Sequence, residues 1–331
     1  MANHIVLPQQ GVGVFHPVIG PTIFDIAMKP FRDKHDQLNG APGEPLSKGL
    51  PENNGSGSRV RYQNGTIYQR ADGSCAWVYG MIGERYDQLG AGASWLGLPV
   101  SDEVEFSEGG RASRFENGAI YFWPDTGAIE MNQVVVHYTG LYAFAETDSD
   151  RFGTTSDEPY VLLGVITPSL SLPVVQSQIY DDVDAGDSRP DLVELYRGMP
   201  EGIAISVLLM EHDEGDPEKY KAAVTAGVAT GGGALAALLA AIPVVGPFVA
   251  PVAAALHGKI APDVISAIDD LIGAGDDDLG TTVLHLTAKQ MVVLAARTVN
   301  QDQWGIGWKA ATESLTGQGS EYKVYFGLVA V

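Results

Sequence analysis

Short apolar runs separated by polar turns dominate the C-terminal half of the chain. Two of them, VVVHYTGLYAFA at 134–145 and YVLLGVI at 160–166, flank a segment rich in acids, Gly, Ser and Thr, which are residues that end strands. Further strands are expected in SLPVVQSQIYDDVDAGDSRPDLVELY, GIAISVLLM, DDDLGTTVLHLT, QMVVLAARTV and EYKVYFGLVAV. Six to eight short strands with polar turns predict an antiparallel β-sandwich over residues 133–331.

The N-terminal half contains a repeat. YQNGTIY at 62–68 matches FENGAIY at 115–121, and Gly40-Ala41-Pro42 is paired with Gly97-Leu98-Pro99. Both copies hold an Asn-Gly pair, which is typical of a tight hairpin turn because its central residues need positive φ. A period slightly above 50 residues indicates stacked units that bury their apolar faces against one another. Residues 1–132 are therefore predicted to form a repeat domain.

The repeated motifs are similar to the LGFP repeat of cell-wall-associated proteins. The Gly-x-Pro pairs, RFENGAIY and DTGAIE carry the resemblance over about residues 35–132, although LNGAP and WLGLP lack the namesake Phe before Pro. The resemblance implies that this domain binds a cell-wall polysaccharide or peptidoglycan. Exposed aromatic side chains would then stack on sugar rings, with Tyr68, Trp77, Tyr121 and Trp123 as the candidates. The alternative is that these aromatics fill the cores of the repeats.

The excess of acidic residues bears on two kinds of partner, nucleic acid and calcium. The chain has a net charge of −21, with 41 acidic and 20 basic residues, which argues against nucleic acid as a partner. Acidic residues gather where the predicted strands end, and alternate loops of a sandwich meet at one end. Several carboxylates from different loops suit calcium, which takes 6–8 oxygen ligands. The candidate ligands are Asp148, Asp150, Asp157, Glu211, Asp213, Asp276 and Asp277. Plain solvated loops are the alternative.

The order of these elements resembles a C2 domain, the calcium- and lipid-binding sandwich. SDEPYV, VLLMEHDEGD and DDDLGTTVLHL carry the resemblance, which points to Glu211, Asp213 and Asp277 as ligands. The sequence departs from the C2 pattern by Glu in place of Asp at 211 and by a large insertion before the last acidic loop. The expected fold class is thus mainly β with an α insertion, in which LGFP-like repeats precede a C2-like β-sandwich that carries a helical hairpin at about 217–275.

The insertion contains a long uncharged segment. Residues 222–258 hold no Asp, Glu, Lys or Arg, are rich in Ala, Leu and Gly, and include a Gly-x-x-x-Gly pair. One interpretation is a buried helical hairpin that packs on the sandwich or on a partner subunit. A second interpretation is that residues 222–257 insert into a bilayer only under certain conditions, as in pore-forming proteins. A third is that this segment spans a membrane permanently. In the membrane interpretations the lipid-contacting residues are Gly227, Gly231, Leu238 and Phe248.

Motifs for catalysis are absent from the sequence. It has no G-x-S-x-G, H-E-x-x-H or phosphate-loop pattern, its seven histidines lack ligand spacing, and Cys75 is its only cysteine. No signal peptide is expected, since the N-terminus lacks a basic segment followed by an apolar run. The favoured prediction is a non-catalytic, calcium-dependent protein of the cell envelope or membrane, extracellular or at the cell surface. A toxin-like pore former, a hydrolase of envelope polymers, a cytoplasmic location and a homo-oligomer stay open.

Overall fold

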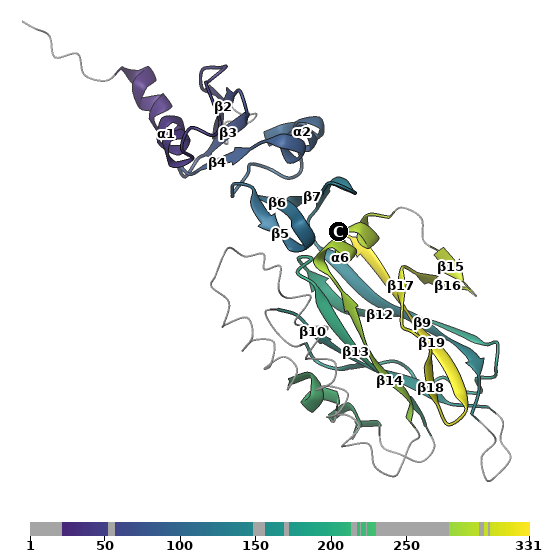
Figure 1. Ribbon diagram of the computed structural model, residues 1–331. Helices are drawn as coiled ribbons and strands as arrows, with labels where there is room; N and C mark the ends of the chain where they lie inside the picture. The colour runs from purple at the N-terminus through teal and green to yellow at the C-terminus, as the bar shows by residue number, and fades with distance from the viewer. Residues whose placement is uncertain are drawn as a thin grey trace, which may run out of the picture.

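The computed structural model describes residues 22–51, 57–147, 156–168, 172–212, 217–218, 220–222, 224–229, 278–297, 301–303 and 305–331. Within these residues the protein is mainly β, with antiparallel sheets and a few helices, as the sequence predicts. Two small repeat units lead into a larger sandwich-like domain (Figure 1).

Each repeat consists of a helix followed by a four-stranded antiparallel sheet. The first has α1 (Ile23–Gln37) and the sheet β1 (Leu50–Pro51), β2 (Gly57–Tyr62), β3 (Gly65–Arg70) and β4 (Cys75–Val78). The second has the helix α2 (Gly80–Leu89), followed by a short 3₁₀ helix η2 (Ala91–Ala93). Its sheet consists of β5 (Val104–Phe106), β6 (Gly110–Phe115), β7 (Gly118–Trp123) and β8 (Gly127–Met131), and a second short 3₁₀ helix, η3 (Ser107–Gly109), connects β5 to β6. The β2–β3 and β6–β7 hairpins lie where the Asn-Gly pairs predict them, but Gln63-Asn64 and Glu116-Asn117 are the central turn residues, and of the two pairs Gly65 alone has positive φ.

The two repeats correspond in a register that differs from the predicted one. Gly97 matches Gly43 rather than Gly40, because a Cβ on Gly43 would collide with Gln63 and a Cβ on Gly97 with the corresponding Glu116, whereas a Cβ on Gly40 would meet His35. The backbone N–H of Glu44 donates to Gln63 Oε1, and that of Leu98 donates to Glu116 Oε2. The matched segments are therefore GEPLS at 43–47 and GLPVS at 97–101. The pairing of Gly40-Ala41-Pro42 with Gly97-Leu98-Pro99 is wrong.

The C-terminal domain contains two antiparallel sheets. One has the order β11-β10-β13-β14, and the other has the order β12-β9-β19-β17, with β18 beside β19. Their bounds are β9 (Val134–Ala145), β10 (Pro159–Ile166), β11 (Val175–Gln176), β12 (Ser188–Gly198), β13 (Ile203–Glu211), β14 (Asp278–Leu286), β17 (Ala310–Ala311), β18 (Leu315–Gly317) and β19 (Ser320–Ala330). A two-stranded ribbon, β15 (Gln301–Gln303) with β16 (Ile306–Trp308), and the helix α6 (Ala288–Ala296) complete the described elements. The predicted QMVVLAARTV strand is wrong, since Met291 lies in α6, which begins at an N-cap box formed by Thr287 and Gln290.

The outer face of the β10–β13 sheet is also covered. Residues 217–218, 220–222 and 224–229 are helical, and Tyr220, Val224 and Val228 pack with Tyr160 and Leu208 of the sheet. Both strands are consequently buried on both faces apart from Glu211. The described start of the predicted insertion thus packs against the sheet.

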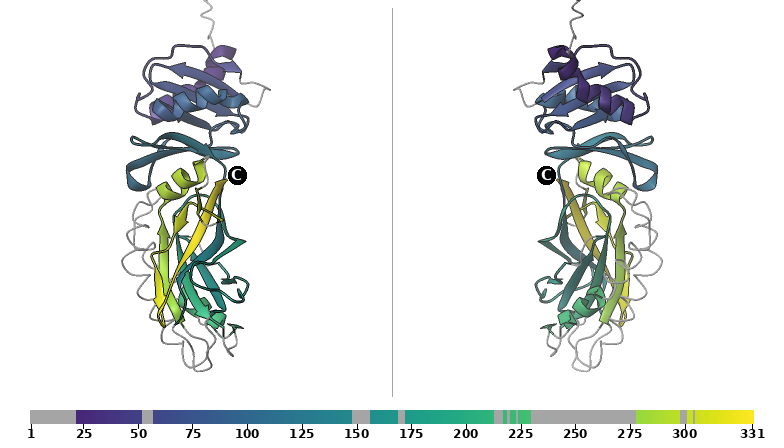
Figure 2. Two further views of the ribbon diagram at one scale, coloured as in Figure 1. Left: turned by 90° about the vertical axis from the view of Figure 1, so that its right-hand side faces the viewer. Right: turned by 90° about the vertical axis from the view of Figure 1, so that its left-hand side faces the viewer.

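Helices and sheets alternate along the repeat array and into the sandwich (Figure 2). Phe31 of α1 packs on one face of the first sheet, and Tyr86 of α2 packs on the other. Ile120 of the second sheet joins the α2 side, whereas Tyr121 and Trp123 join one core cluster with α6 and the sandwich. The helix α6 therefore lies against the second sheet as α2 lies against the first.

Candidate functional site

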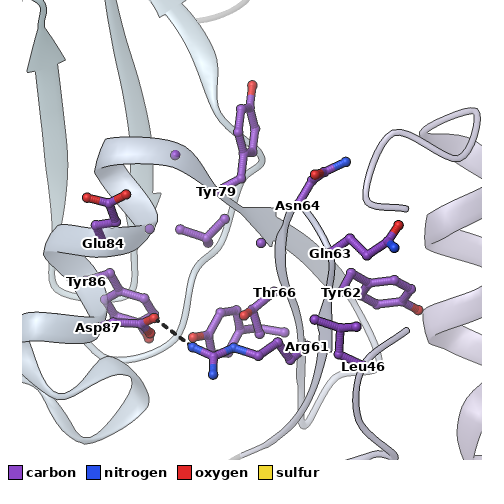
Figure 3. Close-up of a pocket in the computed structure, with 15 residues that line it drawn as sticks. Leu46, Arg61, Tyr62, Gln63, Asn64, Thr66, Tyr79, Glu84, Tyr86 and Asp87 are labelled. Atoms are coloured by element: carbon purple, nitrogen blue, oxygen red, sulfur yellow. Dashed lines mark hydrogen bonds and ion pairs between the residues drawn. The ribbon is translucent and has the colours of Figure 1, made fainter. Parts of the chain in front are cut away.

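An open groove of about 550 Å³ lies between the β2–β3 hairpin of the first sheet and the following helix α2. Arg61 and Asn64 line it from the hairpin side, and Glu84 and Asp87 line it from α2 (Figure 3). All four are exposed, whereas Tyr86 at the groove floor is buried. The groove therefore offers polar groups at its rim, above a floor in which Tyr86 is packed into the core.

Hydrogen bonds to the backbone hold the hairpin side of the groove. Trp77 Nε1 donates to the Asn64 carbonyl oxygen at 2.9 Å, and Asn64 Nδ2 donates to the Ala41 carbonyl oxygen at 3.0 Å. Gly65 has φ +111°, and a Cβ there would lie 2.5 Å from the Val78 carbonyl oxygen, so glycine is required for this close approach. The turn is thereby fixed in place before any ligand arrives.

The rim carries charges of both signs. Arg61 Nη2 lies 3.5 Å from Asp87 Oδ2, and both side chains are about half exposed, so the pair is weakly held and can exchange partners.

The ring of Tyr79 stacks on Trp77 with centroids 3.9 Å apart. Burial, followed by the charge of Glu103, raises the pKa of Tyr79, which keeps its hydroxyl neutral. The groove can thus offer guanidinium, carboxylate and amide groups together, whereas the Tyr79 hydroxyl accepts from Arg111 Nη2 at 3.1 Å.

Comparison with protein families identifies the repeat units. The model of the LGFP repeat matches residues 43–94, which contain β1–β4 and α2, and residues 96–136, which contain β5–β8, whereas α1 precedes both matches. The chain carries two LGFP repeats. The LGFP repeat suggests a cell-surface or cell-wall-associated protein. No curated protein matches the chain.

The aromatic residues predicted to bind glycan are mostly in the core. Tyr68 in the first LGFP repeat and Tyr121 and Trp123 in the second are each at most 1% exposed, so the expectation that these three are exposed is wrong. They are covered because each repeat sheet packs against a following helix. Trp77 is partly exposed and supports the hairpin. Arg61, Glu84 and Asp87 were missed because they come from separate segments, and no motif marked them.

In the second LGFP repeat, the position that corresponds to the groove of the first repeat is occupied by residues of the sandwich. Arg114 corresponds to Arg61 in strand register, and it lies near Glu201 in the loop after β12. Burial raises the pKa of Glu201, and the charge of Arg114 partly offsets the rise. Gln133, which follows β8, exchanges backbone hydrogen bonds with Val331 at 3.0 Å. The open groove therefore belongs to the first LGFP repeat.

Two of the seven predicted calcium ligands lie in the described part of the chain, at one end of the sandwich. Asp157 is 1% exposed, and its carboxylate accepts from the Thr147 backbone N–H at 3.1 Å, the Thr147 hydroxyl at 2.7 Å and the Tyr322 hydroxyl at 2.5 Å. Glu211 ends β13, opposite Pro159. Asp148, Asp150, Asp213, Asp276 and Asp277 lie outside the described residues. Calcium binding stays a prediction.

Further carboxylates, which sequence reasoning did not single out, lie at the same end. Burial, then the charges of Asp184 and Asp157, raises the pKa of Glu146, and Ser156 Oγ donates to Asp184 Oδ1 at 2.9 Å. Burial and the hydrogen bond to Asp157 raise the pKa of Tyr322, and the charges of Glu211 and Glu146 add to the rise. Among the residues that the structure describes, no three His, Cys, Asp or Glu side chains are arranged so that they could hold a metal ion.

The predicted lipid-contacting residues are described only at one position. Gly227 is buried in the helical segment 224–229, next to Val228 on the sheet, whereas Gly231, Leu238 and Phe248 lie outside the described residues. No helix within the described ranges is long and apolar enough to cross a membrane. Pore formation and hydrolysis stay predictions.

Proposed function

We propose that the protein attaches to a cell wall by binding a wall glycan, a polysaccharide or the glycan of peptidoglycan, in the groove of its first LGFP repeat. The observation that carries this proposal is the polar groove between the β2–β3 hairpin and α2, with Arg61, Glu84 and Asp87 at its rim. Its volume of about 550 Å³ falls in the usual range of small-ligand sites.

The chemistry of the rim fits a sugar. Hydroxyl groups both donate and accept, so a sugar can pair with the Arg61 guanidinium as donor and with the Glu84 and Asp87 carboxylates as acceptors. The exposed Arg61–Asp87 pair costs little to open, since such pairs contribute about 0–1 kcal/mol. The carboxylates at the rim also disfavour a highly anionic polymer, which leaves a neutral or zwitterionic glycan as the expected ligand.

Cosedimentation of the full chain with purified cell walls tests the proposal. We expect the triple variant Arg61→Ala, Glu84→Ala, Asp87→Ala to lose at least about tenfold in apparent affinity, because several charge-assisted hydrogen bonds disappear. The matched control is Arg197→Ala, Glu194→Ala, which removes an exposed ion pair from β12, away from the groove. Wall binding by the triple variant as strong as that of the control would exclude the groove.

We also propose that calcium binds at the acidic end of the sandwich. Glu146, Asp157 and Glu211 all lie near enough to Tyr322 to raise its pKa, so carboxylates from separate segments gather there. Calcium would reduce the mutual repulsion of these carboxylates. A calcium that binds only the folded state raises stability by about 2.7 kcal/mol at one hundred times its dissociation constant.

Thermal melts with calcium and with chelator test this second proposal. We expect calcium to raise the melting temperature of the parent protein and to have a smaller effect on Glu146→Gln. Magnesium at the same concentration serves as the control for ionic strength. Identical melts in calcium, magnesium and chelator would reject calcium binding while leaving glycan binding untouched.

A further inference from the structure

A second open groove, of about 590 Å³, lies where the second LGFP repeat meets the sandwich. Its walls are the end of β14, one face of α6 and the start of β17, and Glu108 and Thr126 of the second repeat close one side. It is separate from the proposed glycan groove, with which it shares no lining residue.

The inner surface of this groove is apolar. Leu286 is 3% exposed at the end of β14, and Leu284, Val293 and Leu294 are partly buried around it. Leu284 and Leu294 pack against the main core of the sandwich, so the apolar surface is part of a rigid wall. An aliphatic group would find a fixed, water-poor surface here.

Basic side chains gather on the same groove. Lys289, Arg297 and Lys309 all line it, although residues 133–331 contain only 10 basic against 26 acidic residues. Lys289 Nζ is bound to Asp125 Oδ2 at 2.7 Å and lies 6.0 Å from the ring centroid of Trp123. Glu108 is the one carboxylate among the lining residues, so the groove keeps an excess of positive charge, which lies at Arg297 and Lys309.

Arg297 and Lys309 are held close together without a counter-ion. Lys309 Nζ donates to the Arg297 carbonyl oxygen at 2.9 Å, and within the described chain neither side chain has a carboxylate at ion-pair distance. Burial, followed by the charge of Arg297, lowers the pKa of Lys309. The partly buried Lys309 and the exposed Arg297 repel each other, and an anion between them would remove that repulsion.

We propose that this groove binds an amphipathic anion, an aliphatic chain that ends in a carboxylate or phosphate, with the head between Arg297 and Lys309 and the chain on Leu284, Leu286 and Val293. Guanidinium and ammonium groups recognise both heads, the guanidinium by paired hydrogen bonds. Free lipid-like acids and alkyl phosphates are thus the ligand class. This inference does not depend on glycan binding.

Titration calorimetry on the full chain tests the inference with octanoate and octyl phosphate below their micelle concentrations. We expect both to bind, 1-octanol and inorganic phosphate to bind more weakly, and the variant Arg297→Gln, Lys309→Met to weaken both amphipathic probes by about tenfold or more. Tighter binding of octyl phosphate would place the ligand among alkyl phosphates, and tighter binding of octanoate would place it among fatty acids.

The matched control is Arg197→Gln, Lys323→Met, which removes the same charges from residues that do not line the groove. It should bind the probes as the parent does. The single variant Arg297→Gln, at an exposed side chain, should keep the parent melting temperature and still bind more weakly. Unchanged binding by both groove variants, no binding of either probe to the parent, or inorganic phosphate binding as tightly as octyl phosphate would overturn the inference.

Discussion

Tyr68 in β3 and Tyr121 in β7 hold the same position in the two LGFP repeats and face different parts of the molecule. Tyr68 packs against Tyr86 of α2, with ring centroids 5.4 Å apart. Tyr121 packs against Phe106 at 5.0 Å in the cluster that continues into α6 and the sandwich. Because the second sheet belongs to two cores at once, the repeats and the sandwich are mechanically joined.

The shared core predicts that the second repeat and the sandwich unfold together. Trp123→Ala should destabilise the protein by about 3–5 kcal/mol, since it removes a buried ring from this cluster. Denaturant unfolding followed by far-ultraviolet circular dichroism and by tryptophan fluorescence should give coincident transitions for the parent. Trp95→Ala, at a half-exposed side chain, is the control and should cost much less. Two separate transitions in the parent would contradict the shared core.

The Gly-x-Pro segments predict a specific glycine effect. Gly97 has φ +70°, and a Cβ there would collide with the Glu116 carboxylate that accepts from the Leu98 N–H. Gly97→Ala should therefore lower the free energy of unfolding by about 1–3 kcal/mol. Gly127→Ala is the control, because its φ is +81° but a Cβ would meet nothing within 4 Å. Equal losses for the two variants would show that only backbone strain matters.

The Arg85–Glu130 pair between α2 and β8 predicts a dependence of stability on pH. Its two hydrogen bonds measure 2.7 and 2.6 Å. Burial opposes ionisation of Glu130, but the bonds from Arg85 outweigh it and lower the pKa. A carboxyl group whose pKa is lower in the folded protein than in the unfolded chain stabilises the fold at any pH above its pKa in the unfolded chain. This stabilisation is lost as the pH falls through the pKa that the group has in the folded protein. Glu130→Gln should cost about 1 kcal/mol or less at pH 7 and nothing once the pH is below the lowered pKa of Glu130. Melts from pH 7 to 3 measure this, and a constant difference would contradict it.

The Asp157–Tyr322 hydrogen bond predicts a coupled loss of stability. Tyr322→Phe leaves the buried carboxylate with only the two donors of Thr147, so it should cost about 1–3 kcal/mol. Asp157→Asn should cost a similar amount. A double-mutant cycle measured by urea unfolding should show that the double variant costs clearly less than the two single losses combined. Strict additivity would mean that the bond contributes nothing.

The strands and the hairpins could be predicted from the sequence, because they depend on local patterns. Hairpins form at both Asn-Gly pairs, but the central turn residues are Gln63-Asn64 and Glu116-Asn117, and of the two pairs Gly65 alone has positive φ. Alternation along β7 correctly separates Ile120 from Tyr121 and Trp123, which enter different cores. The alternation of apolar and polar residues shows which side chains share a face of a strand but not what covers that face. For this reason the aromatic rings of Tyr68, Tyr121 and Trp123 were predicted to be exposed although they are buried.

The register of the repeats and the groove depend on information that no local pattern holds. Gly40-Ala41-Pro42 and Gly43-Glu44-Pro45 both fit Gly-x-Pro, and only the hydrogen bond from Glu44 to Gln63 selects the second. Arg61 and Asp87 are 26 residues apart and come together through the packing of α2. The cations Arg297 and Lys309 likewise meet only after α6 and β17 are in place.

The position of α6 against the second sheet gives the array a direction. The last sheet already has its covering helix, which packs into the core of the sandwich and is fastened to the second repeat by the pair between Lys289 and Asp125 in the β7–β8 turn. An added unit at that junction would have to break this contact. Duplication of repeats during evolution could therefore extend such a molecule only ahead of α1. The distance between the second repeat and the sandwich would then stay constant, while the N-terminal end of the repeat array would move away from the sandwich.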